Sequence, residues 1–111
     1  MELIIFDTDI IIWILRGKET IVTDAKRLSE ETSGKIYITP IQVAEVYSGM
    51  TDKEERKTRK LIESFYFLDI NKRIGELAGI YINKYRKSHQ IELADAIIGA
   101  SAKNYNLNYT H

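Results

Sequence analysis

Short apolar runs alternate with longer amphipathic segments along the 111-residue chain. The short runs are rich in β-branched and aromatic residues, and they predict strands at 3–6, 36–39, 66–68 and 107–110. The longer segments predict helices at 10–16, 21–32, 40–49, 52–64, 72–87 and 93–105. Because strands alternate with helices, we expect a three-layer α/β fold with a central parallel sheet flanked by helices.

Capping signals support several of these helix starts. Thr39 is expected to cap the helix 40–49, with Pro40 at the first helical position and Gln42 closing a capping box. A second capping box is expected at 51–54, and Asp9 is the preferred cap of the first helix.

Two acidic residues follow the first two predicted strands. Asp7 comes directly after the strand 3–6, at the sheet edge where open α/β proteins bind their ligands. Glu45 is the only charge in the helix 40–49 and shares a helical row with Ile41, which we expect to face the core. A helix cap remains an alternative role for Asp7, and a buried ion pair remains one for Glu45.

A third acid, Asp95, is the only charge in the apolar run 93–102. Gly99 and Ala102 are expected to leave space beside it on the same helical face. Burial of a lone carboxylate costs several kcal/mol, so Asp95 needs a cation, hydrogen bonds or a raised pKa. An ordinary acid in the first turn of a helix is the alternative.

The three acids together suggest a metal site. Three carboxylates about 5 Å apart repel by roughly 3 kcal/mol per pair at an effective dielectric near 20, so the cluster needs a cation. The chain has no cysteine, and its two histidines, at 89 and 111, are poorly spaced as ligands. Oxygen ligands favour Mg²⁺ or Mn²⁺, which activate water for phosphodiester hydrolysis. The predicted catalytic and metal-binding residues are Asp7, Glu45 and Asp95.

Composition narrows the functional classes. Sixteen basic and sixteen acidic residues give no net charge, which argues against a strongly basic nucleic-acid coat. The absence of cysteine excludes a disulfide framework and a thiol nucleophile. The apolar stretch 3–15 is too short to span a bilayer, and the N-terminus lacks the basic region of a signal peptide. A cytoplasmic protein that is not bound to a membrane is expected.

The segments 5–10, 39–49 and 93–100 resemble PIN domains in order and spacing. Together they look most like the VapC-type toxins of bacterial and archaeal toxin–antitoxin pairs. The resemblance covers essentially the whole chain and implies a metal-dependent endoribonuclease that uses Mg²⁺ or Mn²⁺. It also implies a VapB-like antitoxin as partner and RNA as substrate, with tRNA among the candidate substrates.

The resemblance also assigns individual positions. Asp7, Glu45 and Asp95 match the acidic positions of the family, in which the first and the last are the usual metal ligands. Thr8 matches a small polar position beside the first acid, and Thr110 matches a Thr or Ser near the last strand. These two residues and the neighbouring acid Asp9 are the expected supporting residues.

Family members usually continue past this point through an Asn- or Asp-bearing loop and a further short strand. We therefore expect one domain over 1–111 that is truncated at its C-terminus and lacks the last edge strand. The number of metal ions stays open, and a catalytically inactive PIN-like binding domain is the main alternative.

Other features carry weaker expectations. Arg86 and Lys87 follow an aromatic residue and are candidates for RNA contact, with an ordinary basic loop as the alternative. Trp13 is expected in the core or in a homodimer interface. Two other folds also stay open: Asp7 and Asp9 are similar to the paired acids of haloacid-dehalogenase-type phosphatases, and Asp69 leaves room for a receiver domain.

Overall fold

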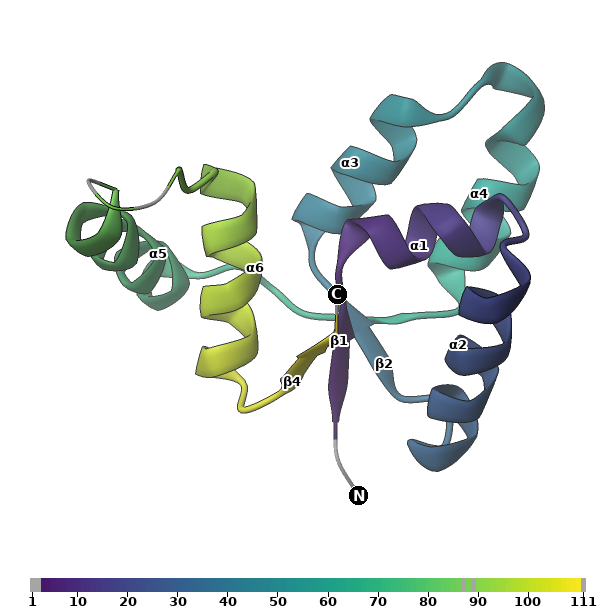
Figure 1. The fold of residues 1–111 in the computed structure, drawn as a ribbon, viewed down its shortest axis with the longest axis horizontal. Coiled ribbons are helices and arrows are strands. Elements are labelled where there is room, and N and C mark those ends of the chain that lie inside the picture. Colours follow the sequence, from purple (N-terminus) through teal and green to yellow (C-terminus); the bar gives the residue numbers. More distant parts are fainter. Residues whose placement is uncertain (1–2, 87, 89, 111) are drawn as a thin grey trace.

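The computed structural model describes residues 3–86, 88 and 90–110. Figure 1 shows helices on both sides of a small central sheet. The elements are β1 (Ile4–Phe6), α1 (Thr8–Leu15), α2 (Glu19–Glu31), β2 (Ile36–Ile38), α3 (Pro40–Gly49), the 3₁₀ turn η1 (Asp52–Glu54), α4 (Glu55–Glu63), β3 (Tyr66–Phe67), α5 (Lys72–Tyr85), α6 (Leu93–Asn104) and β4 (Asn108–Thr110). The predicted alternation of strands and helices is confirmed.

The sheet is parallel, with strand order β3-β2-β1-β4. Ile5 of β1 pairs with Tyr37 of β2 on one side and with Tyr109 of β4 on the other. Receiver domains place their third strand beside the first, whereas here β4 occupies that position. The strand order therefore excludes the receiver alternative.

Alternating side chains of β1 supply the cores on the two faces of the sheet. Ile4 and Phe6 pack in a cluster with buried residues of α1, α3 and α4, while α2 adds partly buried side chains. Ile5 points to the opposite face and packs with Ile98 of α6. A third cluster joins α5 to α6. The helices α5 and α6 thus cover one face and α1 to α4 the other, which confirms the three-layer architecture (Figure 1).

The first helix begins earlier than predicted, and its cap is Asp7 rather than Asp9. The Asp7 backbone is extended, with φ −66° and ψ 153°, and its Oδ1 accepts a 2.6 Å hydrogen bond from the Asp9 amide. Since β1 ends at Phe6, the chain enters the helix after a single extended residue, and Asp9 already lies in the first turn. The predicted cap at Thr39 is confirmed, with both arms of the capping box present.

The side of α3 that faces the core also differs from the prediction. Gln42 and Val46 are buried, whereas Glu45 is only half-buried. In the row that Glu45 shares with Ile41, Ile41 packs against the core but Ala44 and Ser48 are exposed. The cause is the Gln42 side chain, whose Oε1 accepts from the Thr39 amide and whose Nε2 donates to the Phe6 carbonyl at 3.0 Å. These bonds fix the rotation of α3 against the end of β1.

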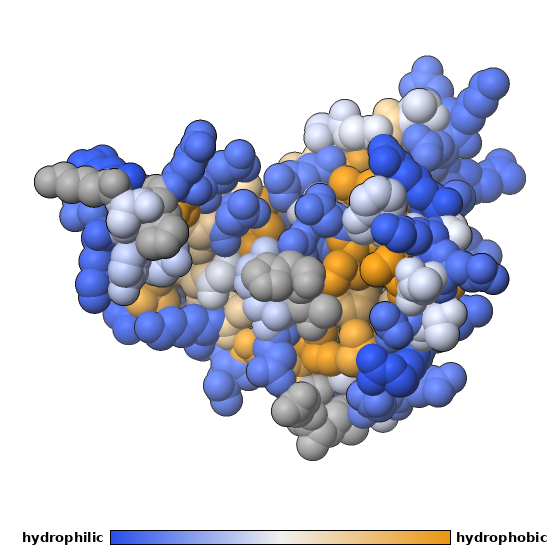
Figure 2. Space-filling model, viewed as in Figure 1, coloured by the Kyte–Doolittle hydropathy of each residue, from blue (hydrophilic) through white to orange (hydrophobic). Residues whose placement is uncertain are grey.

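The surface carries apolar groups in the middle of one face, with hydrophilic side chains around them (Figure 2). Trp13 is 39% exposed, and the Lys18 ammonium lies 4.4 Å from its ring centroid. Trp13 is therefore a surface residue and not part of the core. No helix in the described part of the chain is long and apolar enough to cross a membrane.

Candidate active site

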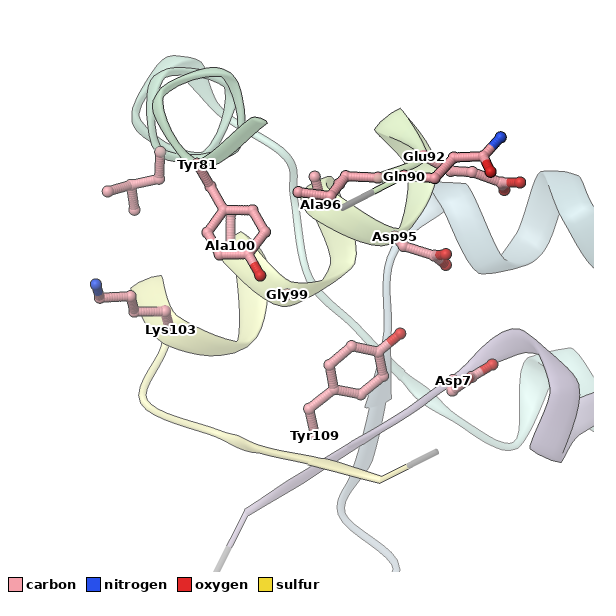
Figure 3. Close-up of a pocket in the computed structure, with 12 residues that line it drawn as sticks. Asp7, Tyr81, Gln90, Glu92, Asp95, Ala96, Gly99, Ala100, Lys103 and Tyr109 are labelled. Carbon is pink, nitrogen blue, oxygen red and sulfur yellow. The ribbon is translucent and has the colours of Figure 1, made fainter. Parts of the chain in front are cut away.

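A cleft with a volume of about 600 Å³ opens between α5, α6 and the adjoining strands β1 and β4. Asp7, from the carboxyl end of β1, and Asp95, from the first turn of α6, both line it. Figure 3 shows both carboxylates projecting toward the same end of the cleft. Glu92, the residue before α6, lines the cleft as well, so this end is acidic.

Asp95 is exposed rather than buried, which corrects the expectation from its apolar neighbours. The helix α6 buries Ile98 and Ala102 against the sheet, and Asp95 lies on the part of the surface that opens into the cleft. Ala102 therefore does not provide space beside Asp95, whereas Gly99 does line the cleft as expected. An exposed carboxylate needs no compensating partner, because water solvates its charge.

Glu45 is joined to the site through Thr8. The buried Thr8 hydroxyl donates a 2.6 Å hydrogen bond to Glu45 Oε1, which connects the start of α1 to the middle of α3. Glu45 does not line the cleft, and no ion pair among the described residues includes it. In place of the buried ion pair, the structure has a hydrogen bond from a hydroxyl to a carboxylate, and its 2.6 Å length is typical of charge-assisted bonds.

Tyr109 was not among the residues predicted from the sequence. It is a half-buried residue of β4, and its side chain lies at the acidic end of the cleft. Burial raises the pKa of its phenol well above the usual range, and the negative charges of nearby acids raise it further. In order of effect these acids are Asp7, Asp95, Glu45 and Asp9. Figure 3 shows the Tyr109 hydroxyl directed toward Asp7 and Asp95. All four acids thus act on a single neutral hydroxyl group.

The model of the PIN domain family matches residues 4–109. The chain belongs to the PIN-domain family. Ribonuclease VapC10 of Mycobacterium tuberculosis is 32% identical to this PIN domain over 101 residues, which are 90% of this chain and 74% of the relative.

Solved structures agree with this assignment. A toxin–antitoxin complex from Klebsiella pneumoniae contains a chain with 28% identity and a TM-score of 0.76, covering 95% of this PIN domain and 82% of that chain. FitAcB from Neisseria gonorrhoeae has 26% identity and a TM-score of 0.74, covering 96% and 84%. The resemblance to VapC-type PIN domains is therefore confirmed.

The donor groups of this PIN domain fit a hard cation, although not in the form expected. The described residues contain no group of three His, Cys, Asp or Glu side chains close enough to hold an ion together. Magnesium is commonly held by one or two carboxylates and keeps several waters. Asp7 and Asp95 both line the cleft and fit this type of site. Glu45 does not line the cleft, and its carboxylate accepts a hydrogen bond from Thr8 instead. Metal binding itself stays a prediction.

The backbones of two further predicted residues, Asp9 and Thr110, lie close to Asp7 in the fold. Asp9 is exposed in the first turn of α1, and the backbone of Thr110 pairs with Phe6 across β4 and β1. Arg86 is exposed at the end of α5 and does not line the cleft. Lys87 lies outside the described residues.

Proposed function

We propose that this PIN domain is a Mg²⁺- or Mn²⁺-dependent endoribonuclease that acts as the toxin of a VapBC-type pair. The observation that carries the proposal is the meeting of Asp7 and Asp95, from distant parts of the chain, at one end of a cleft. This arrangement lies in a chain related to a protein named as a ribonuclease, Ribonuclease VapC10.

The proposal gives separate roles to Asp7 and Asp95, to the groups that hold acidic side chains in place, and to Tyr109. Asp7 and Asp95 would hold the ion, which when bound lowers the pKa of a water and offsets charge on a phosphoryl oxygen. The Asp9 amide fixes the Asp7 carboxylate, and the Thr8 hydroxyl fixes Glu45. Tyr109 stays a neutral phenol and therefore adds no negative charge where a phosphate must approach.

Cleavage of a labelled structured RNA by the purified protein tests this proposal. We expect cutting with Mg²⁺, none with EDTA, and none with Asp7→Asn. Asparagine is as good a helix cap as aspartate, so this variant removes the charge and keeps the start of α1. Asp24→Asn, on the exposed side of α2 and outside the cleft, is the matched control and should cut normally. If the folded wild-type protein does not cut the RNA, this would contradict the proposed endoribonuclease activity and favour a PIN domain that binds without cutting.

The proposed partner is a VapB-like antitoxin. Its support is that the Klebsiella chain, 28% identical to this one, was solved as a toxin–antitoxin complex. Co-expression with a VapB-type antitoxin from the same genome should give a complex that elutes together and no longer cuts RNA. If RNA cutting continues undiminished in an excess of every such antitoxin, this would contradict the proposed VapB-like partner.

A further inference from the structure

The cleft continues beyond the acids along one row of α6. Asp95, Gly99 and Lys103 all line it and are spaced four residues apart, so they lie on the same helical face. The row covers roughly 12 Å of helix rise. It therefore presents a carboxylate at one end, an ammonium group in the last turn of the helix, and no side chain between them.

The gap at Gly99 is open space. A Cβ atom placed there would meet nothing within 4 Å, and the backbone of Gly99 is not in the left-handed region. Tyr81 of α5 lines the cleft opposite, is 50% exposed, and is directed toward α6 (Figure 3). The centroid of the Tyr81 ring lies 4.9 Å from that of the Tyr85 ring, and this aromatic contact restricts the orientation of the Tyr81 side chain. One wall of the gap is thus an accessible aromatic ring and the other is bare helix.

We propose that this gap is a nucleobase subsite. In it, one unpaired base of the RNA, next to the phosphate at the acidic end, stacks on Tyr81 over Gly99. The inference rests on the proposed function and adds to it a binding site for one base of the substrate, formed by named residues of this chain. Sequence-tolerant stacking of splayed bases on aromatic rings is the usual mode of single-strand recognition.

Charge and size favour a nucleotide over an apolar peptide. Lys103, exposed at the far end, is placed to contact a phosphate one or more nucleotides along the strand. The volume of about 600 Å³ lies within the range of pockets that enclose small organic ligands. The gap is continuous with the acids, so a base in it brings the adjoining phosphate to them.

A pair of glycine variants tests whether the gap is used. Gly99→Leu fills it, while Gly79→Leu adds the same side chain on α5 outside the cleft, where a Cβ also meets nothing. Both changes replace a helical glycine and should stabilise the helix. We expect Gly99→Leu to raise KM for RNA at least roughly fivefold, the low end of the measured effect of one base stack. Gly79→Leu should leave KM unchanged.

Tyr81 variants identify the base itself. After the cut is mapped, RNAs are made with an abasic nucleotide at each position beside it. Tyr81→Ala should raise KM at least roughly fivefold on intact RNA and have no effect on the RNA that lacks the stacked base. Tyr81→Phe keeps the ring and should restore the wild-type KM.

The outcomes separate this inference from the proposed function. Wild-type protein that cuts, with unchanged KM in both Gly99→Leu and Tyr81→Ala, overturns the subsite and leaves the nuclease standing. If KM is unchanged in both variants but they no longer bind the antitoxin, the cleft binds a peptide, and the nucleobase subsite is also overturned. If the wild type does not cut, binding of the labelled RNA is compared by fluorescence anisotropy. Weaker binding by both variants supports the subsite, and equal or absent binding overturns it.

Discussion

Asp7 serves two purposes that need different properties of one side chain. As the cap of α1 it needs only an oxygen that accepts the Asp9 amide, and asparagine could supply that. As a residue of the cleft it presents a negative charge beside Asp95. A negative charge at the helix start also interacts favourably with the helix dipole. This favourable interaction at the helix start therefore offsets part of the electrostatic repulsion between the carboxylates at this end of the cleft.

The exposure of Asp95 makes it the better residue for separating function from stability. Asp95→Asn should reduce RNA cutting a hundredfold or more, because ion-mediated stabilisation of charge is worth several kcal/mol. The free energy of unfolding should change by no more than about 0.5 kcal/mol, since the side chain is exposed. Cleavage assays and urea unfolding check the two halves. Destabilisation well above 1 kcal/mol would instead indicate a structural partner for Asp95.

A second residue-level prediction concerns Thr58, on α4. Its hydroxyl is buried and has no hydrogen-bond partner among the described residues. Thr58→Val keeps the shape and removes the unsatisfied group, so it should raise the free energy of unfolding by about 1 kcal/mol. Thr23→Val, on the exposed surface of α2, is the matched control and should change stability by no more than about 0.5 kcal/mol. A destabilised Thr58→Val protein in urea unfolding would show that the hydroxyl is solvated.

The sequence predicted that Asp7 and Asp95 meet at one edge of the sheet, but not how their carboxylates are solvated. Asp7 and Asp95 could be singled out because a charge is unusual directly after a buried strand or within an apolar helix. Burial of Asp95 could not be judged, since it depends on which side of α6 meets the sheet. Tyr109 carried no signal of its own, because an aromatic residue in a strand is ordinary until its neighbouring strand is known.

At the scale of elements, Gln42 ties the end of β1 to the start of α3. Its amide is fully buried and bonds both the Thr39 amide and the Phe6 carbonyl. Gln42→Leu keeps the volume but leaves both backbone groups unpaired, so it should lower the free energy of unfolding by about 2 to 4 kcal/mol. Urea unfolding measures this change. Asp7 directly follows Phe6, so the folded variant should also cut RNA more slowly than the wild type. An unchanged free energy of unfolding would contradict the role of Gln42 as a tie between β1 and α3.

Most elements could be predicted because the chain marks their ends. Gly17 and Gly34 adopt positive φ angles of 70° and 79° after α1 and α2, as helix-ending glycines do. The capping box at Thr39 was readable for the same reason, since its residue types and spacing are specific. The core-facing side of α3 was not readable from hydrophobicity, because a polar residue, Gln42, occupies the most buried position.

At the scale of the whole molecule, the strand order brings the acidic end together. With β4 beside β1, Tyr109 stands opposite Ile5 and close to Asp7, although these residues come from the two ends of the chain. Alternating strands and helices predict a parallel sheet but leave the order of its strands open. The zero net charge also gives no hint of a local acidic centre, because equal numbers of both signs can still be distributed unevenly.

The same assembly predicts that a divalent ion stabilises the fold. Asp7 and Asp95 come together only in the native state, so an ion held by both binds the folded chain and not the unfolded one. At a free Mg²⁺ concentration one hundred times Kd, this adds about 2.7 kcal/mol, a shift of several degrees in Tm for a small domain. Thermal unfolding followed by circular dichroism should show the shift in wild-type protein and not in Asp95→Asn. Sodium chloride at matched ionic strength controls for screening of the acids. Equal shifts in both proteins, or no shift with millimolar Mg²⁺ or Mn²⁺, would contradict a metal site at this end of the cleft.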